Sequence, residues 1–329
     1  MMITCSNAPS TVPSDSGVAG IGVLLSFIIT AAIALAISAS LVFQEARRRV
    51  SHKPSVLRRK LLNAYSDQQI LTGIGIQSVG LAKSESLVPY HFFIIWILSL
   101  LSMAVHNASL LVLVRDFRRD WVLRWLRQFL IFVNLTLSSL YGVYILRAVQ
   151  EGINDSTFPI ACVWAKTDGT GQASTGNSAF SFFGTIVVIA GNVIVFVLAT
   201  WYLHSRTQRF YKAIQIVGLL LMTAISIGAV VRVSLLADAF GGDHPIKLSD
   251  GGERQWSFGQ LLSVGMLLLP LVTIVEIYRG EIKCASPVDD IGEDKARLLG
   301  DNELQLNPLD QDSFQPNPFF GSRTNLFKK

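Results

Sequence analysis

Long uninterrupted runs of apolar residues are the feature that most limits how this chain folds. Six of them reach about 20 residues, the length that a helix needs to cross roughly 30 Å of hydrocarbon. They cover residues 18–43, 90–114, 129–149, 180–203, 213–236 and 257–278. In hydrocarbon, a spanning segment has to satisfy its own backbone hydrogen bonds, which selects helices. The runs therefore predict an all-α, polytopic membrane protein.

A seventh and weaker segment covers residues 67–82, which contain Gly73, Gly75, Gly80 and a mid-span Gln77. Charge placement decides how to interpret it, because Lys and Arg favour the cytosolic side of short loops. Basic clusters occupy residues 47–60, 115–127 and 206–212. If the weak segment did not span, the first two clusters would lie on opposite sides of the membrane. We therefore predict seven transmembrane helices, with the N-terminus outside the cytosol and the C-terminus inside.

The glycines of this weak segment also have a predicted use. Helices in lipid gain no hydrophobic drive for association, and small residues let their backbones approach closely. We expect this helix to lie inside the bundle.

The pattern divides the chain into an outer segment (1–17), a membrane domain (18–278) and a cytosolic tail (279–329) whose polar composition predicts disorder. Only 16% of the residues are charged, against about 25% in soluble domains. The net charge of +5 is spread over loops instead of forming one patch, which argues against nucleic-acid binding. The sequence shows no internal repeat and no broken-helix signal, features typical of many secondary transporters.

Two stretches are similar to a known group of proteins. One reads GVAGIGV from Gly17, and the other reads YSDQQILTGIGI from Tyr65. With Tyr90 and His91 at the start of the next run, they resemble a large group of uncharacterised fungal integral membrane proteins. The resemblance covers most of the membrane region but not the tail. It implies the topology and a fungal setting, and it supplies no reaction or ligand.

Polar residues inside spans are costly and are therefore candidates for function. They are Asp67, Gln68, Gln69, His106, Asn107, Asn134, Asn192, Arg232 and Glu276. Many of them also have a structural interpretation. Asn134 and Asn192 suit hydrogen bonds between helices. His106 suits a hydrogen-bonded core position, with a proton-linked role as the alternative.

The charged candidates have structural interpretations too. Asp67 is expected to cap the N-terminus of the second helix. Arg232, near the outer interface, is expected to snorkel or to pair with Asp238, and binding an anionic group is the alternative. Glu276 is expected to meet Arg279 or the basic loops.

Patterns of catalytic chemistry are missing from the sequence. It has no His or Cys cluster with metal spacing, no visible Ser, His and Asp arrangement and no phosphate loop. We therefore expect no metal and no cofactor, and lean against an enzyme. The seventh run also lacks the lysine of a retinal Schiff base. A receptor-like sensor, a transporter or channel for a small molecule, and an enzyme of lipid-soluble or secondary-metabolite chemistry stay open as function classes.

The cysteines differ in their predicted side of the membrane. Cys5 and Cys162 fall on the translocated side, where oxidation is favoured. We predict a disulfide between them, and two unpaired cysteines are the alternative. Cys284, just inside the cytosol, suits palmitoylation.

The predicted tail holds two short motifs of the kind that sorting adaptors read. They are Asp294, Leu298 and Leu299, which resemble an acidic dileucine signal, and Asn317, Pro318 and Phe319, which form an NPF peptide. We predict endocytic or vacuolar sorting adaptors as partners besides the lipid bilayer. The corresponding locations are the plasma membrane and the endosomal or vacuolar membrane.

Asn154 begins an Asn-Asp-Ser sequence in a predicted outer loop, an acceptor for N-glycosylation. We predict that glycosidase treatment shifts the mobility of the protein in gels and that Asn154→Gln abolishes the shift. Asn134 heads a similar sequence but lies within a span, so Asn134→Gln serves as the control and keeps the shift. A wild-type protein without any shift would contradict the predicted topology.

Overall fold

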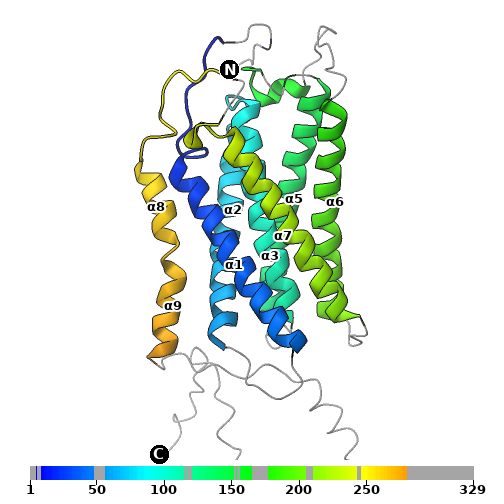
Figure 1. Cartoon of the computed structure of the whole chain (residues 1–329). Coiled ribbons are helices and arrows are strands. Elements are labelled where there is room, and N and C mark those ends of the chain that lie inside the picture. The colour runs from blue at the N-terminus through cyan, green and yellow to red at the C-terminus, as the bar shows by residue number, and fades with distance from the viewer. Residues whose placement is uncertain are drawn as a thin grey trace, which may run out of the picture. The chain divides into compact units, whose positions relative to one another are not determined.

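The structure is a computed structural model that describes residues 5, 9–47, 56–114, 117, 121–151, 153, 156–164, 177–204, 210–242 and 246–279. The helices are α1 (Ile21–Arg47), α2 (Val56–Ala82), α3 (Pro89–Val112), α5 (Trp121–Gln150), α6 (Asn177–His204), α7 (Tyr211–Leu236), α8 (Phe258–Met266) and α9 (Leu269–Tyr278). Two short 3-10 helices, η1 (Ile160–Trp164) and η2 (Asp238–Phe240), lie in the connections. The described part of the chain contains no β-strand, so the all-α prediction is confirmed there (Figure 1).

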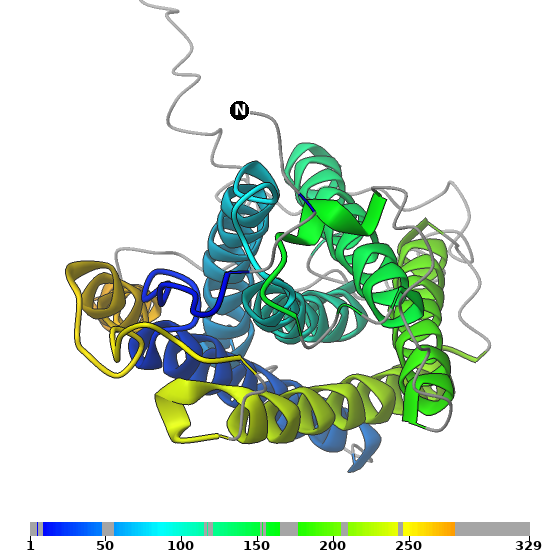
Figure 2. The same ribbon diagram turned by 90° about the horizontal axis from the view of Figure 1, so that it is seen from above.

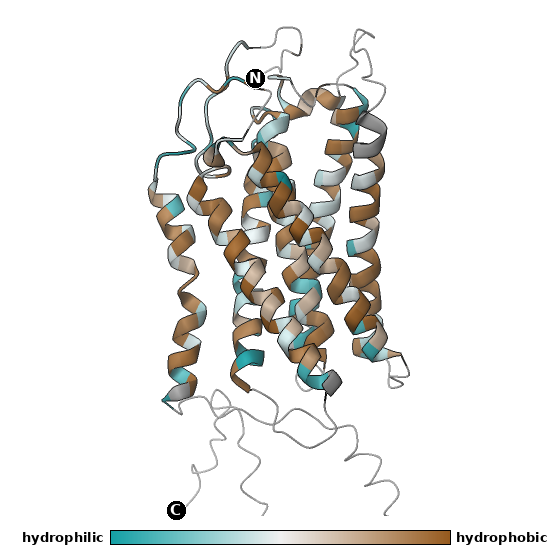
Figure 3. Cartoon of the chain, in the orientation of Figure 1, coloured by the Kyte–Doolittle hydropathy of each residue, from teal (hydrophilic) through white to brown (hydrophobic). Residues whose placement is uncertain are grey.

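Six helical segments within the described residues are long and apolar enough to cross a membrane. They are α1, α3, α5, α6, α7 and the stretch formed by α8 and α9. Hydrophobic residues predominate along these helices (Figure 3), and large hydrophobic side chains are exposed on all of them except α3. Trp201 on α6, for example, is 70% exposed. Such a surface is unfavourable in water and suits contact with lipid. The chain is therefore a multi-pass integral membrane protein.

The central element of the bundle is α3. Every one of its residues except Phe93 is buried. The helices α1, α2, α5, α6 and α7 all pack against it, and Figure 2 shows it enclosed by them. A helix without a lipid-facing side is surrounded by protein only, so its polar side chains need partners on the neighbouring helices.

The weak apolar segment forms the second half of α2. This helix begins at Val56, eleven residues before the predicted start at Asp67. Because Asp67 lies in the middle of the helix, the prediction that it caps the N-terminus is wrong. One face of the helix packs against α1, α3, α5 and α9, whereas Leu71 on another face is 71% exposed. We predicted a helix inside the bundle, and α2 meets this prediction on its buried face only.

Two of the three α2 glycines lie at close helix contacts. A Cβ added at Gly73 would lie 2.5 Å from the Ser102 hydroxyl of α3. A Cβ at Gly80 would overlap the Tyr141 hydroxyl of α5 and Ile95 of α3. These two positions therefore set how closely α2 approaches its neighbours.

The seventh apolar run is interrupted, which differs from the single unbroken span that we predicted. Helix α8 ends at Met266 and α9 begins at Leu269, with Pro270 in its first turn. Proline has no backbone N–H for the carbonyl four residues earlier, and its ring clashes with that carbonyl. The broken-helix signal was therefore present in the sequence at Pro270, and the prediction overlooked it.

The first helix begins against α8. The backbone N–H of Gly22, one of the orphan donors of the first turn, donates to Gln260 Oε1 at 3.1 Å. Gln260 is fully buried, and a Cβ at Gly20 or Gly22 would overlap it. The glycines of GVAGIGV thus make room for a side chain that caps α1.

Segments far apart in the sequence meet at one end of the bundle, which we call the N-terminal face. Val12 forms a parallel bridge with residues 247–249, on the segment between η2 and α8. Lys83, after α2, pairs with Asp15 at 2.9 Å. The first residue of η1 donates its backbone N–H to the carbonyl of Leu87 at 2.8 Å. The starts of α1, α3 and α8 and the ends of α2 and α7 therefore lie together (Figure 1).

We predict that alanine at the close-contact glycines destabilises the protein. Gly73→Ala and Gly80→Ala force overpacking against α3 and α5, which costs about 1–3 kcal/mol. Gly75→Ala is the matched control on the same helix, because a Cβ there meets nothing within 4 Å. Thermal unfolding in detergent should show lower midpoints for the first two variants and an unchanged or higher midpoint for the third. Equal midpoints for all three would contradict the close packing of α2.

Candidate functional site

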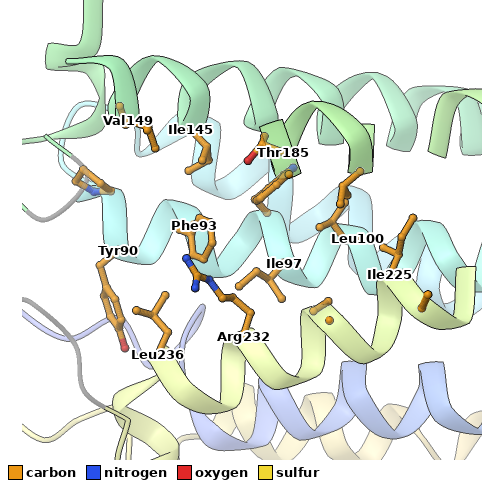
Figure 4. A pocket seen from close by; sticks show the side chains of 18 residues that line it. Tyr90, Phe93, Ile97, Leu100, Ile145, Val149, Thr185, Ile225, Arg232 and Leu236 are labelled. Carbon is orange, nitrogen blue, oxygen red and sulfur yellow. The ribbon is translucent and has the colours of Figure 1, made fainter. Parts of the chain in front are cut away.

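A large cavity opens between α3, α5, α6 and α7. Its volume is about 630 Å³, within the range of roughly 300–1,000 Å³ that is usual for small-molecule sites. The walls are mainly apolar, with Ile97, Ile145, Val188 and Ile225 from the four helices in turn (Figure 4). Because Pro89 and Leu236 also line it, the cavity lies in the half of the bundle next to the N-terminal face.

Arg232 of α7 is the one charged residue among the described residues that line the cavity. Its guanidinium carbon lies 5.8 Å from the centre of the Phe93 ring, a cation–π distance. Figure 4 shows the side chain directed across the cavity toward Phe93. The predicted partner, Asp238, instead pairs with Arg254 at 2.8 Å. Pairing between Arg232 and Asp238 was therefore a wrong prediction, because Arg254 takes the carboxylate.

A buried carboxylate adjoins the same end of the cavity. Glu253, which is fully buried, accepts a hydrogen bond from the Tyr90 hydroxyl at 2.9 Å and lies 2.7 Å from His91 Nε2. Tyr90 also lines the cavity. Removing one partner of such a buried pair leaves an uncompensated polar or charged group. The cluster of Tyr90, His91 and Glu253, here called the latch, therefore joins the connection before α8 to the start of α3.

Two further contacts extend the latch. The backbone N–H of Asp238 donates to the Tyr90 hydroxyl oxygen at 2.9 Å, and the N–H of Ile21 donates to the Glu253 carbonyl at 3.2 Å. The latch consequently connects the end of α7 and the start of α1 as well. Its carboxylate and imidazole are 0% and 2% exposed, so they stabilise this face and do not present groups to a solvent-borne substrate.

A second polar cluster lies between α2, α3 and α5. His106 is fully buried, with Nδ1 3.3 Å from the Ser66 hydroxyl and Nε2 3.0 Å from the Ser102 hydroxyl. Asn134 donates to the same Ser102 hydroxyl at 3.2 Å and accepts from the Gln77 amide. The structure therefore places His106 and Asn134 in hydrogen bonds between helices.

The other predicted residues lie elsewhere. Asn107 of α3 donates to the Asn192 side chain of α6 at 3.3 Å. Asp67 of α2 pairs with Arg127 of α5 toward the opposite end of the bundle. Glu276 lies on α9. The proposed intramembrane residues are thus distributed over several places and do not form one site.

Gln68 and Gln69 follow Asp67 on α2. Gln69 is 2% exposed, and no hydrogen-bond partner of its Oε1 lies among the described residues. The carbonyl of Gln69 accepts from the Ser102 hydroxyl at 3.1 Å, while the carbonyl of Gln68 accepts from the Thr72 hydroxyl at 3.0 Å. Gln69 therefore borders the His106 cluster, whereas Gln68 is only half-buried.

Cys5 and Cys162 lie at disulfide distance, with sulfur atoms 2.08 Å apart. The pair joins the N-terminal segment to η1. Several other predicted features lie outside the described residues: Asn154, Cys284, the tail beyond residue 279 and the sorting motifs at Asp294, Leu298, Leu299, Asn317, Pro318 and Phe319. The glycan and the adaptor partners stay predictions.

Sequence reasoning did not find the cavity or Glu253. The cavity depends on how four apolar helices are spaced relative to one another, and no local sequence pattern encodes this spacing. Glu253 sits in a connection of ordinary polar composition, and only folding brings it to Tyr90 and His91. The Tyr-His pair at the start of a span was the available signal.

The comparisons with known proteins found no matching family model, no matching curated protein and no matching solved structure. Likeness to the fungal group therefore stays a prediction carried by its motifs. Among the described residues, no group of three His, Cys, Asp or Glu side chains could hold a metal ion. The cavity is the feature with the dimensions of a binding site, and we treat it as the candidate functional site.

We predict that Glu253→Ala strongly destabilises the protein. It leaves the Tyr90 hydroxyl and His91 buried without their acceptor, a loss that costs about 3–5 kcal/mol for a buried pair. Glu85→Ala, at an exposed acidic residue on the same face, is the control and should stay within about 0.5 kcal/mol of wild type. The measurement is thermal unfolding in lipid nanodiscs. Equal midpoints for the two variants would show that the latch does not stabilise the fold.

Proposed function

We propose that the protein is a seven-pass membrane receptor or sensor that binds a lipophilic small molecule in the cavity between α3, α5, α6 and α7. The observation that carries the proposal is the cavity itself, a preformed apolar space of about 630 Å³ beside the N-terminal face. Concave, mostly apolar spaces of this size with a few polar groups are typical of ligand sites.

The seventh span is α2. Its start is held at the end of α1, because Arg58 donates to Ser40 at 3.1 Å and to Gln44 at 2.6 Å. Its end is held at the start of α1, because Lys83 pairs with Asp15. Helix α2 is therefore antiparallel to α1, and it extends from one end of α1 to the other. With the basic clusters in the cytosol, the N-terminal face then lies outside it.

Helices α3, α5 and α7 line the cavity and continue into the cytosolic half of the bundle. They therefore connect a ligand bound in the cavity to contacts on the cytosolic side. Arg127 on α5 pairs there with Asp67 of α2. On α7, Gln215 donates to the carbonyl of Leu111 near the end of α3 at 3.2 Å. A ligand that changes how α5 and α7 pack on α3 would therefore change the cytosolic contacts of the same helices. Such coupling requires the ligand to bind one arrangement better than the other.

The alternative is a transporter, and one observation favours it. The span formed by α8 and α9 is discontinuous at residues 267–268, and broken helices frequently form the substrate sites of secondary transporters. However, the break lies on helices that contact α1 and α2, and none of the residues lining the cavity comes from α8 or α9. A carrier would therefore have to use a path other than the cavity.

The test uses Gly228, which lines the cavity and has nothing within 4 Å of an added Cβ. Gly228→Phe should occupy part of the cavity with its ring, whereas Gly75→Phe puts the same bulk on an open position of α2. A neutral diazirine-bearing fatty alcohol in nanodiscs should label peptides of α3 and α7 in wild type and in Gly75→Phe, and should lose this labelling in Gly228→Phe.

Hydrogen exchange then separates the function classes. Saturating ligand should change exchange at the cytosolic ends of α2 and α5 in wild type but not in Gly228→Phe. Equal labelling of the α3 and α7 peptides in wild type and in Gly228→Phe would contradict the proposed binding site. Flux of the ligand across proteoliposomes, without a change at the cytosolic ends, would select the transporter.

A further inference from the structure

We infer that the cavity selects an amphipathic organic anion, with an apolar body against α3, α5 and α6 and one acidic head group paired with Arg232. This inference rests on the proposed function, since it names the chemical class of the ligand at the same site. The acidic group is a carboxylate or a phosphate, which are the anions that a guanidinium binds best.

The first observation is a cation without a carboxylate partner. Among the described residues, no acidic side chain lies within ion-pair distance of Arg232, and its one recorded contact is the Phe93 ring. Asp238 and Glu253, which lie at this end of the bundle, are already engaged: Asp238 by Arg254, and Glu253 by the latch. The guanidinium therefore keeps its hydrogen-bonding capacity for a group that enters the cavity.

The second observation is the contrast between Arg232 and the rest of the lining. The remaining lining residues carry no formal charge and are mostly aliphatic or aromatic. Charged side chains within spans are costly and rare, and such residues usually serve a pathway or a ligand. An apolar wall with a single cation at one end matches a molecule with the opposite pattern, an apolar body with a single negative end.

The direction of the side chain separates binding from snorkelling. A snorkelling arginine follows the helix surface out to the interface. Arg232 is exposed, but its guanidinium reaches over the Phe93 ring of α3, on the side of the cavity where Tyr90 and Leu236 lie (Figure 4). Since these residues belong to the half next to the N-terminal face, a ligand would place its head toward that face and its body toward the bundle centre.

The experiment compares two probes that differ only in charge: a diazirine-bearing palmitic acid with a terminal alkyne, and the fatty alcohol of the same chain. Both are titrated against wild type, Arg232→Gln and Arg232→Lys in phosphatidylcholine nanodiscs, in mildly alkaline buffer so that the acid is ionised. Cross-linking to α3 and α7 peptides gives the apparent affinities. Because Arg232→Gln removes a charge-assisted hydrogen bond, we expect this variant to bind the palmitic acid probe roughly tenfold more weakly than wild type does.

The expected result is that wild type prefers the acid about tenfold over the alcohol, and that Arg232→Gln removes this preference without weakening the alcohol. Arg232→Lys should keep most of it. Equal affinity for acid and alcohol in wild type, or a preference that survives Arg232→Gln, would overturn the inference while leaving the cavity as a binding site. If neither probe labels the cavity peptides more than in Gly228→Phe, the proposed function fails as well.

A last arm identifies the source of the anion. Nanodiscs that also contain phosphatidylglycerol offer an acidic head group on a membrane lipid. Competition of that lipid with the palmitic acid probe would support the anion site and assign it to a phospholipid. Absence of competition, with the acid preference intact, would support the site and assign it to a free amphiphile.

Discussion

The nearly complete burial of α3 is the constraint on which the rest of the structure depends. A helix that contacts only other helices exposes no polar side chain to lipid. Each of its polar side chains, however, needs a hydrogen-bond partner on a particular neighbouring helix. His106 faces α2 through Ser66, and Asn107 faces α6 through Asn192. These contacts decide which helix lies on which side of α3, a choice that apolar packing alone leaves open.

The same constraint explains the position of the cavity. In the half opposite the N-terminal face, polar contacts such as those of Leu111 with Gln215 hold α7 to α3. Toward the N-terminal face, apolar side chains and one arginine line the space between α7, α5 and α6. The latch adjoins that end, because Tyr90 both lines the cavity and donates a hydrogen bond to Glu253. The cavity wall and the connections at the N-terminal face are therefore joined through Tyr90.

Much of the fold could be predicted from the sequence because lipid makes long apolar runs nearly sufficient to specify helices. Charge parity also singled out the weak segment that forms α2. The polar residues were harder to interpret. Asp67 looked like a cap because its segment was taken to begin there, whereas basic residues such as Arg58 and Arg59 lie inside the helix. Partners such as Glu253 for His91 are distant in sequence, and no local pattern encodes them.

The central claim is that α2 crosses the membrane, so that its two ends lie on opposite sides. Single cysteines at Leu57, at the start of α2, and at Glu85, just after its end, test it with a membrane-impermeant maleimide on sealed vesicles of known orientation. Both positions are exposed. We predict that the Glu85 position is labelled only from the side of the N-terminus and the Leu57 position only from the other side. Labelling of both positions from the same side would contradict the seven-helix topology.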